Sequence, residues 1–123
     1  MGYSITVEKY FSAAHKLRGY QGKCESLHGH NWKVHVTISS GCLDKIGMVM
    51  DFKDAKKILD SILDKLDHTQ LSKLSFFKKY NPTSERIAEY IFKEYQKKLK
   101  NDCLVQKVIV WETATSSASF DGK

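Results

Sequence analysis

Two segments with alternating apolar and polar residues constrain the fold of this chain most. Between residues 5 and 15 the odd positions are Ile, Val, Lys, Phe, Ala and His, and between residues 28 and 38 the even positions are His, His, Trp, Val, Val and Ile. A period of two places such side chains on one face of a β-strand. We therefore expect two strands whose buried faces carry His15 at the end of the first and His28 and His30 at the start of the second.

Two later segments have the spacing of amphipathic helices. Asp51 is expected to cap the first helix, and Thr83 or Ser84 in the run NPTSE is expected to cap the second. Each helix has one apolar stripe, which packs against a sheet or another helix. The expected buried positions are Phe52, Ala55, Ile58, Leu59, Ile62, Leu63 and Leu66 in the first helix, and Ile87, Ala88, Ile91, Phe92, Tyr95 and Leu99 in the second.

Further strands are expected at residues 107–113 and 117–120, which gives the order strand, strand, helix, helix, strand, strand. Strands and helices in separate runs indicate the α+β class, here as one domain over residues 1–123, with a four-stranded antiparallel sheet and both helices on one face. A small sheet has open edges, and pairing with neighbouring subunits would cover them. We therefore expect an oligomer.

Composition argues against several functional classes. The formal net charge is +6, Arg occurs only at positions 18 and 86, and many of the lysines lie on the polar faces of the expected helices. That distribution predicts a solvated surface and no nucleic-acid partner. The sequence has neither a signal-peptide pattern nor a continuous apolar run of membrane-spanning length, so we expect a cytoplasmic protein without membrane contact. Three cysteines without paired spacing favour reduced thiols over disulfides.

The histidines on the two expected strands form the first candidate site. Residues two apart on a strand project to the same side roughly 6.6 Å apart, which lets the imidazoles of His28 and His30 turn onto one ion. If the strands pair as a hairpin, His15 supplies a third nitrogen on the same face. Three nitrogens leave one position of a tetrahedral zinc ion open, which is typical of a catalytic site. Unrelated core histidines are the alternative.

Three more acidic or nucleophilic positions have two or more interpretations. Cys24, four residues before His28, would close the zinc site as a fourth ligand, act as a base or nucleophile with a lowered pKa, or be an inert loop thiol. Asp67 would orient His68 for proton transfer, or His68 would only offset the dipole of the preceding helix. Glu112 ends an apolar row, where it would reach water or, in a pocket, bind two adjacent N–H donors of a guanine-like or pterin ring.

Six segments, in this order, resemble the 6-pyruvoyltetrahydropterin synthase family: FSAAH (11–15), CESLHGHN (24–31), GMVMDF (47–52), LDHTQL (66–71), NPTSE (81–85) and WET (111–113). The resemblance spans nearly the whole chain. Within the family, the three-residue gap between Cys24 and His28 and the run NPTSE look like the 6-carboxytetrahydropterin synthase branch, which serves 7-deazapurine (queuosine) biosynthesis.

The resemblance implies the tunnelling fold, in which four-stranded sheets join into a trimeric barrel and two trimers stack as a homohexamer with active sites between subunits. It implies a zinc ion bound by His15, His28 and His30. It also implies Cys24 as the catalytic base with Asp67 and His68 as its partner dyad, and Glu112, Thr83, Ser84 and Glu85 as pterin-binding residues.

A specific reaction follows from the same resemblance. The expected activity is conversion of 7,8-dihydroneopterin triphosphate into 6-carboxy-5,6,7,8-tetrahydropterin, with release of acetaldehyde and triphosphate. One alternative is a 6-pyruvoyl tetrahydropterin synthase that stops after triphosphate elimination. Another is a non-catalytic pterin- or purine-binding protein in which Cys24 ligates a structural zinc, and a basic nucleic-acid-binding domain is a third.

Overall fold

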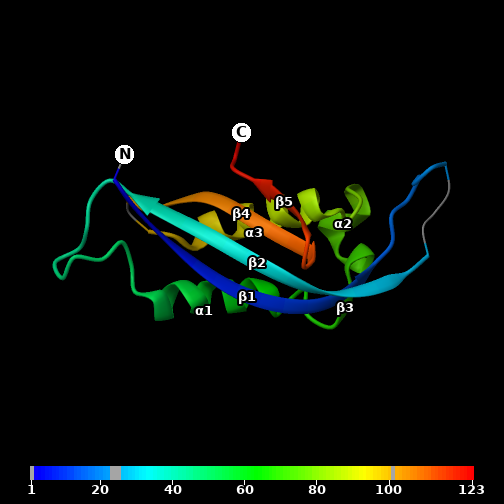
Figure 1. Ribbon diagram of the computed structural model, residues 1–123, viewed down its shortest axis with the longest axis horizontal. Coiled ribbons are helices and arrows are strands. Elements are labelled where there is room, and N and C mark those ends of the chain that lie inside the picture. The colour runs from blue at the N-terminus through cyan, green and yellow to red at the C-terminus, as the bar shows by residue number, and fades with distance from the viewer. Residues whose placement is uncertain (1, 23–25, 101) are drawn as a thin grey trace.

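The computed structural model describes residues 2–22, 26–100 and 102–123. All the expected strands and helices are present, whereas β3, η1 and α2 were not expected, because segments of two to five residues are too short to show a period. The elements, shown in Figure 1, are β1 (Tyr3–His15), β2 (His28–Ser40), α1 (Phe52–Leu63), β3 (Thr69–Gln70), the 3-10 helix η1 (Leu71–Lys73), α2 (Ser75–Lys79), α3 (Ser84–Lys98), β4 (Leu104–Thr113) and β5 (Ser116–Phe120).

The strands form one sheet in the order β3-β1-β2-β4-β5. The pairs β1–β2, β2–β4 and β4–β5 are antiparallel, whereas β3 pairs parallel with β1 at Ala13 and Ala14. β1 and β2 form a long hairpin, and the residues that directly follow β1 lie at the end of the molecule where α2 lies (Figure 1). The α+β class is confirmed, and the described sheet has one short strand more than the four that were expected.

The helices pack on one face of the sheet. α1 contacts β1, and α3 contacts β4 and β5. Odd positions of β1 from Val7 onward, except the partly exposed Lys9, and even positions of β2 from Trp32 onward are buried, while the positions between them are more exposed. The alternation in the sequence therefore identified the core face correctly, and the strand histidines lie at the edge of this core.

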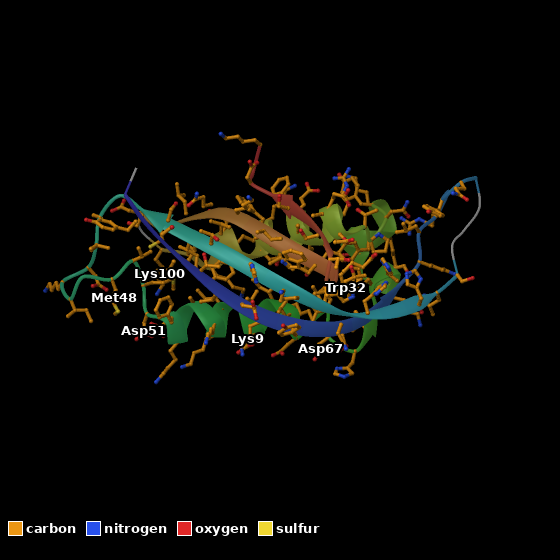
Figure 2. All side chains as sticks on the ribbon, in the orientation of Figure 1. Lys9, Trp32, Met48, Asp51, Asp67 and Lys100 are labelled. Atoms are coloured by element: carbon orange, nitrogen blue, oxygen red, sulfur yellow. The ribbon has the colours of Figure 1, made fainter. Side chains whose placement is uncertain are left out.

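The expected burial of Phe52 is wrong, because this side chain is 58% exposed. Phe52 is the first residue of α1, and the buried stripe begins at Ala55, one turn later. In Figure 2 the preceding Asp51 lies toward one end of the molecule, whereas Trp32 lies well away from it. The first turn of α1 therefore precedes the part of the helix that the core covers.

The expected helix caps are present. Asp51 accepts a hydrogen bond from the N–H of Lys53 at 2.7 Å. Of the two candidates at the second helix, Thr83 is the cap and accepts a hydrogen bond from the N–H of Arg86 at 3.1 Å, while Ser84 is the first helical residue.

Among the helices in the described ranges, none has the length and apolar character that crossing a membrane requires.

Candidate metal and catalytic site

Three strand histidines meet where the β1–β2 hairpin leaves the core. His15 lies directly opposite His28 in the antiparallel register, and His30 lies opposite Ala13. One ring nitrogen of each imidazole falls within 4.8 Å of the other two. The expected hairpin and the convergence of the three histidines on one face are therefore confirmed.

Hydrogen bonds to two of these imidazoles determine which nitrogen faces the cluster. His15 Nδ1 lies 2.8 Å from the Pro82 carbonyl oxygen, and His28 Nδ1 lies 2.8 Å from the Ser26 carbonyl oxygen. Because a carbonyl oxygen only accepts, each Nδ1 carries the hydrogen and each neutral ring keeps its lone pair on Nε2. These two Nε2 atoms lie 3.1 Å apart. Two lone pairs at that distance repel each other unless a cation is shared between them.

The rest of the cluster also favours a cation. His30 Nε2 is buried without a hydrogen-bond partner in the described part of the chain. Glu112 Oε1 lies 3.4 Å from His15 Nε2 and 3.8 Å from His30 Nε2. Burial lowers the pKa of His15, although the Pro82 hydrogen bond and the Glu112 charge oppose the shift, so the imidazole resists protonation. Neutral imidazole nitrogens beside a carboxylate are a donor set that fits zinc.

Trp32 packs against two of the histidine rings. Its ring is fully buried and makes edge contacts with His15 at 4.9 Å and with His30 at 5.2 Å between ring centroids. The Trp32 Nε1–H donates to the Ala13 carbonyl oxygen at 3.2 Å, which satisfies its only polar atom. The alternation had placed Trp32 on the histidine face, but a packing role for it was not predicted.

The dyad of Asp67 and His68 is anchored to β1 through Ser12. The Asp67 Oδ1 accepts from the Ser12 N–H at 2.8 Å, and the His68 N–H donates to the Ser12 carbonyl oxygen. Asp67 Oδ2 lies 3.1 Å from His68 Nδ1. The Ser12 hydrogen bond, with help from His68, lowers the pKa of Asp67 and keeps it a carboxylate. The Asp67 carboxylate therefore contacts the His68 imidazole and orients it.

The short strand β3 determines where this dyad lies. It follows His68 directly and pairs with Ala13 and Ala14, so it places the dyad beside the end of β1. His68 has a backbone φ of 58° and a side chain that is 81% exposed. His68, Gln70 and His30 line one open depression together with Ser12 and Asn31. The proposed proton carrier and one strand histidine therefore border the same surface.

The remaining predicted residues differ in how the structure places them. Glu112 reaches the histidine cluster from β4, as described above. Thr83 caps α3 next to Pro82, whose carbonyl binds His15; Ser84 is half-buried and Glu85 is exposed. Cys24 lies outside the described residues, so its role stays a prediction.

Comparison with known proteins identifies the family of this chain. The family model described as 6-pyruvoyl tetrahydropterin synthase matches residues 4–123. A 6-carboxy-5,6,7,8-tetrahydropterin synthase of Haemophilus influenzae is 37% identical, covering 96% of this chain and 98% of its own. A dihydroneopterin monophosphate aldolase of Pyrococcus furiosus is 35% identical, covering 83% and 82%. The structure of Caenorhabditis elegans 6-pyruvoyl tetrahydropterin synthase is 29% identical with a TM-score of 0.82, covering 99% and 98%. The chain therefore belongs to the 6-pyruvoyl tetrahydropterin synthase family.

Proposed function

We propose that this protein is a zinc-dependent lyase that converts 7,8-dihydroneopterin triphosphate and water into 6-carboxy-5,6,7,8-tetrahydropterin, acetaldehyde and triphosphate, in a 7-deazapurine pathway. The observation that carries the proposal is the cluster of His15, His28 and His30, whose ring nitrogens fall within 4.8 Å of one another. Three donors are one fewer than a closed tetrahedral zinc site needs, so a substrate oxygen has a position to occupy. The name of the Haemophilus influenzae relative supports this reaction.

Each remaining residue has a role in this proposal. A zinc ion held by the three histidines would polarise the side-chain hydroxyls of the substrate and acidify the adjacent C–H bond. The Cys24 thiolate removes a proton from that carbon. His68, oriented by Asp67, carries a proton to or from the substrate. Elimination then releases triphosphate, and water cleaves the bond between the two carbonyl carbons of the remaining side chain, which leaves the carboxyl group on the ring and releases acetaldehyde.

Glu112 is proposed to orient the pterin ring. A carboxylate accepts two parallel hydrogen bonds from adjacent N–H groups, which matches the amidine edge of a pterin. Its Oε1 lies 3.4 Å from His15 Nε2, so a ring bound there keeps its side chain close to the metal donors. Thr83, Ser84 and Glu85 at the start of α3 are proposed to bind the same ring.

The proposed assembly is a homohexamer with active sites between subunits, in the cytoplasm. Two observations support an interface at the site. The His68 side chain is 81% exposed in the isolated chain, where water would compete for its protons. The strands β3 and β5 form the two edges of the sheet, and edge strands of this kind are available for pairing.

Product analysis tests the reaction most directly. Zinc-loaded protein is incubated with the mono- and triphosphates of 7,8-dihydroneopterin, and products are resolved by mass. The proposal predicts a 6-carboxypterin product, acetaldehyde and free triphosphate. A pyruvoyl product without acetaldehyde would favour the second candidate, which the name of the Caenorhabditis elegans structure supports. A phosphorylated aldehyde from the monophosphate would indicate the aldolase activity named for the Pyrococcus relative, and no turnover would contradict an enzyme.

Substitution of Cys24 separates catalysis from a structural zinc site. The proposal predicts that Cys24→Ala keeps its zinc and its fold but loses turnover. Cys42 is an exposed free thiol and provides the matched control, since Cys42→Ala should keep both zinc and turnover. Loss of zinc and of folding in Cys24→Ala would instead indicate the non-catalytic protein with a structural metal.

A further inference from the structure

We infer that Asn81 is a positioning residue for the metal site, and this inference rests on the proposed function. The Asn81 side chain forms two hydrogen bonds with the backbone of a single residue in the segment after β1. Its Oδ1 accepts from the Arg18 N–H at 2.8 Å, and its Nδ2 donates to the Arg18 carbonyl oxygen at 2.8 Å. Such a two-point contact fixes both the distance and the orientation of the two segments.

The contact lies one residue from the acceptor that orients His15. The carbonyl oxygen of Pro82 accepts the Nδ1–H of His15 at 2.8 Å, and the Pro82 side chain is buried. Arg18 follows His15 by three residues. The three hydrogen bonds therefore close a small ring of chain, in which His15 and Arg18 on one side face Pro82 and Asn81 on the other.

Both sides of this ring are held by neighbouring structure. The Asn81 carbonyl oxygen accepts from the Thr83 N–H at 2.9 Å, and Thr83 in turn caps α3. On the other side, the Arg18 guanidinium donates to the Phe77 carbonyl oxygen in α2 at 3.1 Å. Asn81 thus joins the start of α3 to the segment that follows His15. Removal of the Asn81 side chain would therefore allow the Pro82 carbonyl to shift relative to His15. Partners that orient a ligating imidazole typically change metal affinity about 10- to 100-fold when removed.

The test compares zinc affinity in Asn81→Ala, in the wild type and in a control. Gln96 forms a similar carboxamide-to-backbone hydrogen bond, since its Oε1 accepts from the Val105 N–H at 2.9 Å, but this bond joins α3 to β4. Gln96→Ala therefore removes a structural bond without touching the ring. Zinc affinity is measured by competition with a chromophoric chelator, and the visible spectrum of the cobalt-substituted proteins reports ligand geometry.

We expect Asn81→Ala to bind zinc about 10-fold more weakly and to change the cobalt spectrum, while Gln96→Ala resembles the wild type in both. Asn81→Asp keeps one acceptor and loses the donor, and it provides the same comparison if the alanine variant does not fold. Wild-type zinc affinity in folded Asn81 variants would overturn the inference alone. A wild type that binds no zinc would overturn the proposed function as well.

Discussion

At the scale of single residues, the fold favours the deprotonated form of both His15 and Asp67. Burial lowers the pKa of His15 below its ordinary 6.5, and the Ser12 hydrogen bond lowers that of Asp67 below its ordinary 3.8. Each group has a lower pKa in the folded chain than in the unfolded chain. Between these two values the unfolded chain binds more protons, so the stability that each group contributes is lost as the pH falls. The His15 contribution fades first, from about pH 6.5 downward, and the Asp67 contribution fades only in the acid range.

The metal-free protein should therefore lose stability as the pH drops from about 7 to 5, because the unfolded imidazole of His15 takes up a proton that the buried one does not. Denaturant unfolding in the presence of a chelator measures this loss. His15→Gln should reduce the pH dependence. Equal pH dependence in His15→Gln and the wild type would contradict the assignment.

A second residue-scale prediction concerns Glu112. Glu112→Gln should lower kcat/KM about 10- to 100-fold while leaving zinc affinity unchanged, since hydrogen bonds to a charged group contribute about 1.5–3 kcal/mol. Steady-state kinetics and chelator competition measure the two effects separately. Glu94→Gln changes a carboxylate that pairs with Lys97 on α3 and should alter neither. If Glu112→Gln releases zinc, Glu112 is a metal ligand and its proposed role is wrong.

The sequence identified side chains at the site but not backbone contacts. His15, His28 and His30 could be predicted because strand alternation places them on one face. The Pro82 carbonyl and the backbone of Ser12 could not, since every residue carries the same backbone groups and only the fold selects one. Asn81 is the first residue of the run NPTSE, yet its bonds to Arg18 depend on how two distant segments meet.

At the scale of elements, one buried hydrogen bond joins the two long helices. The Tyr95 hydroxyl on α3 donates to the Ala55 carbonyl oxygen of α1 at 2.8 Å, and both residues are fully buried. Tyr95→Phe should therefore lower the free energy of unfolding by about 0.5–1.5 kcal/mol, because it removes a buried hydrogen bond. Zinc affinity should not change. Chemical denaturation tests this, with the half-buried Tyr90→Phe as the control; equal stability of the two variants would contradict it.

The long elements were predictable and the short ones were not. β1, β2, α1 and α3 each repeat a period over many residues, which a pattern in the sequence reveals. β3 consists of two residues and exists because β1 offers a partner, so nothing local distinguishes it. That strand places the dyad beside β1. The part of the site that the sequence could not locate is thus the part that depends on a non-local pairing.

At the scale of the whole molecule, the exposed His68 and the sheet edges β3 and β5 support the subunit interfaces of the proposed hexamer. Light scattering on the eluted protein should give six times the subunit mass of 14.1 kDa. Dilution to smaller species should reduce turnover, because the proposed active sites lie between subunits. A monomer with full activity would contradict this assembly.

X-ray absorption at the zinc edge tests the central claim, which is that His15, His28 and His30 hold the metal while Cys24 stays free for the substrate. We expect zinc bound in the wild type, with histidine nitrogens at about 2.0–2.1 Å and no sulfur neighbour. The His28→Ala variant should lose most of that zinc. A sulfur shell at about 2.3 Å would make Cys24 a ligand, and a wild type without zinc would contradict the proposed metal site altogether.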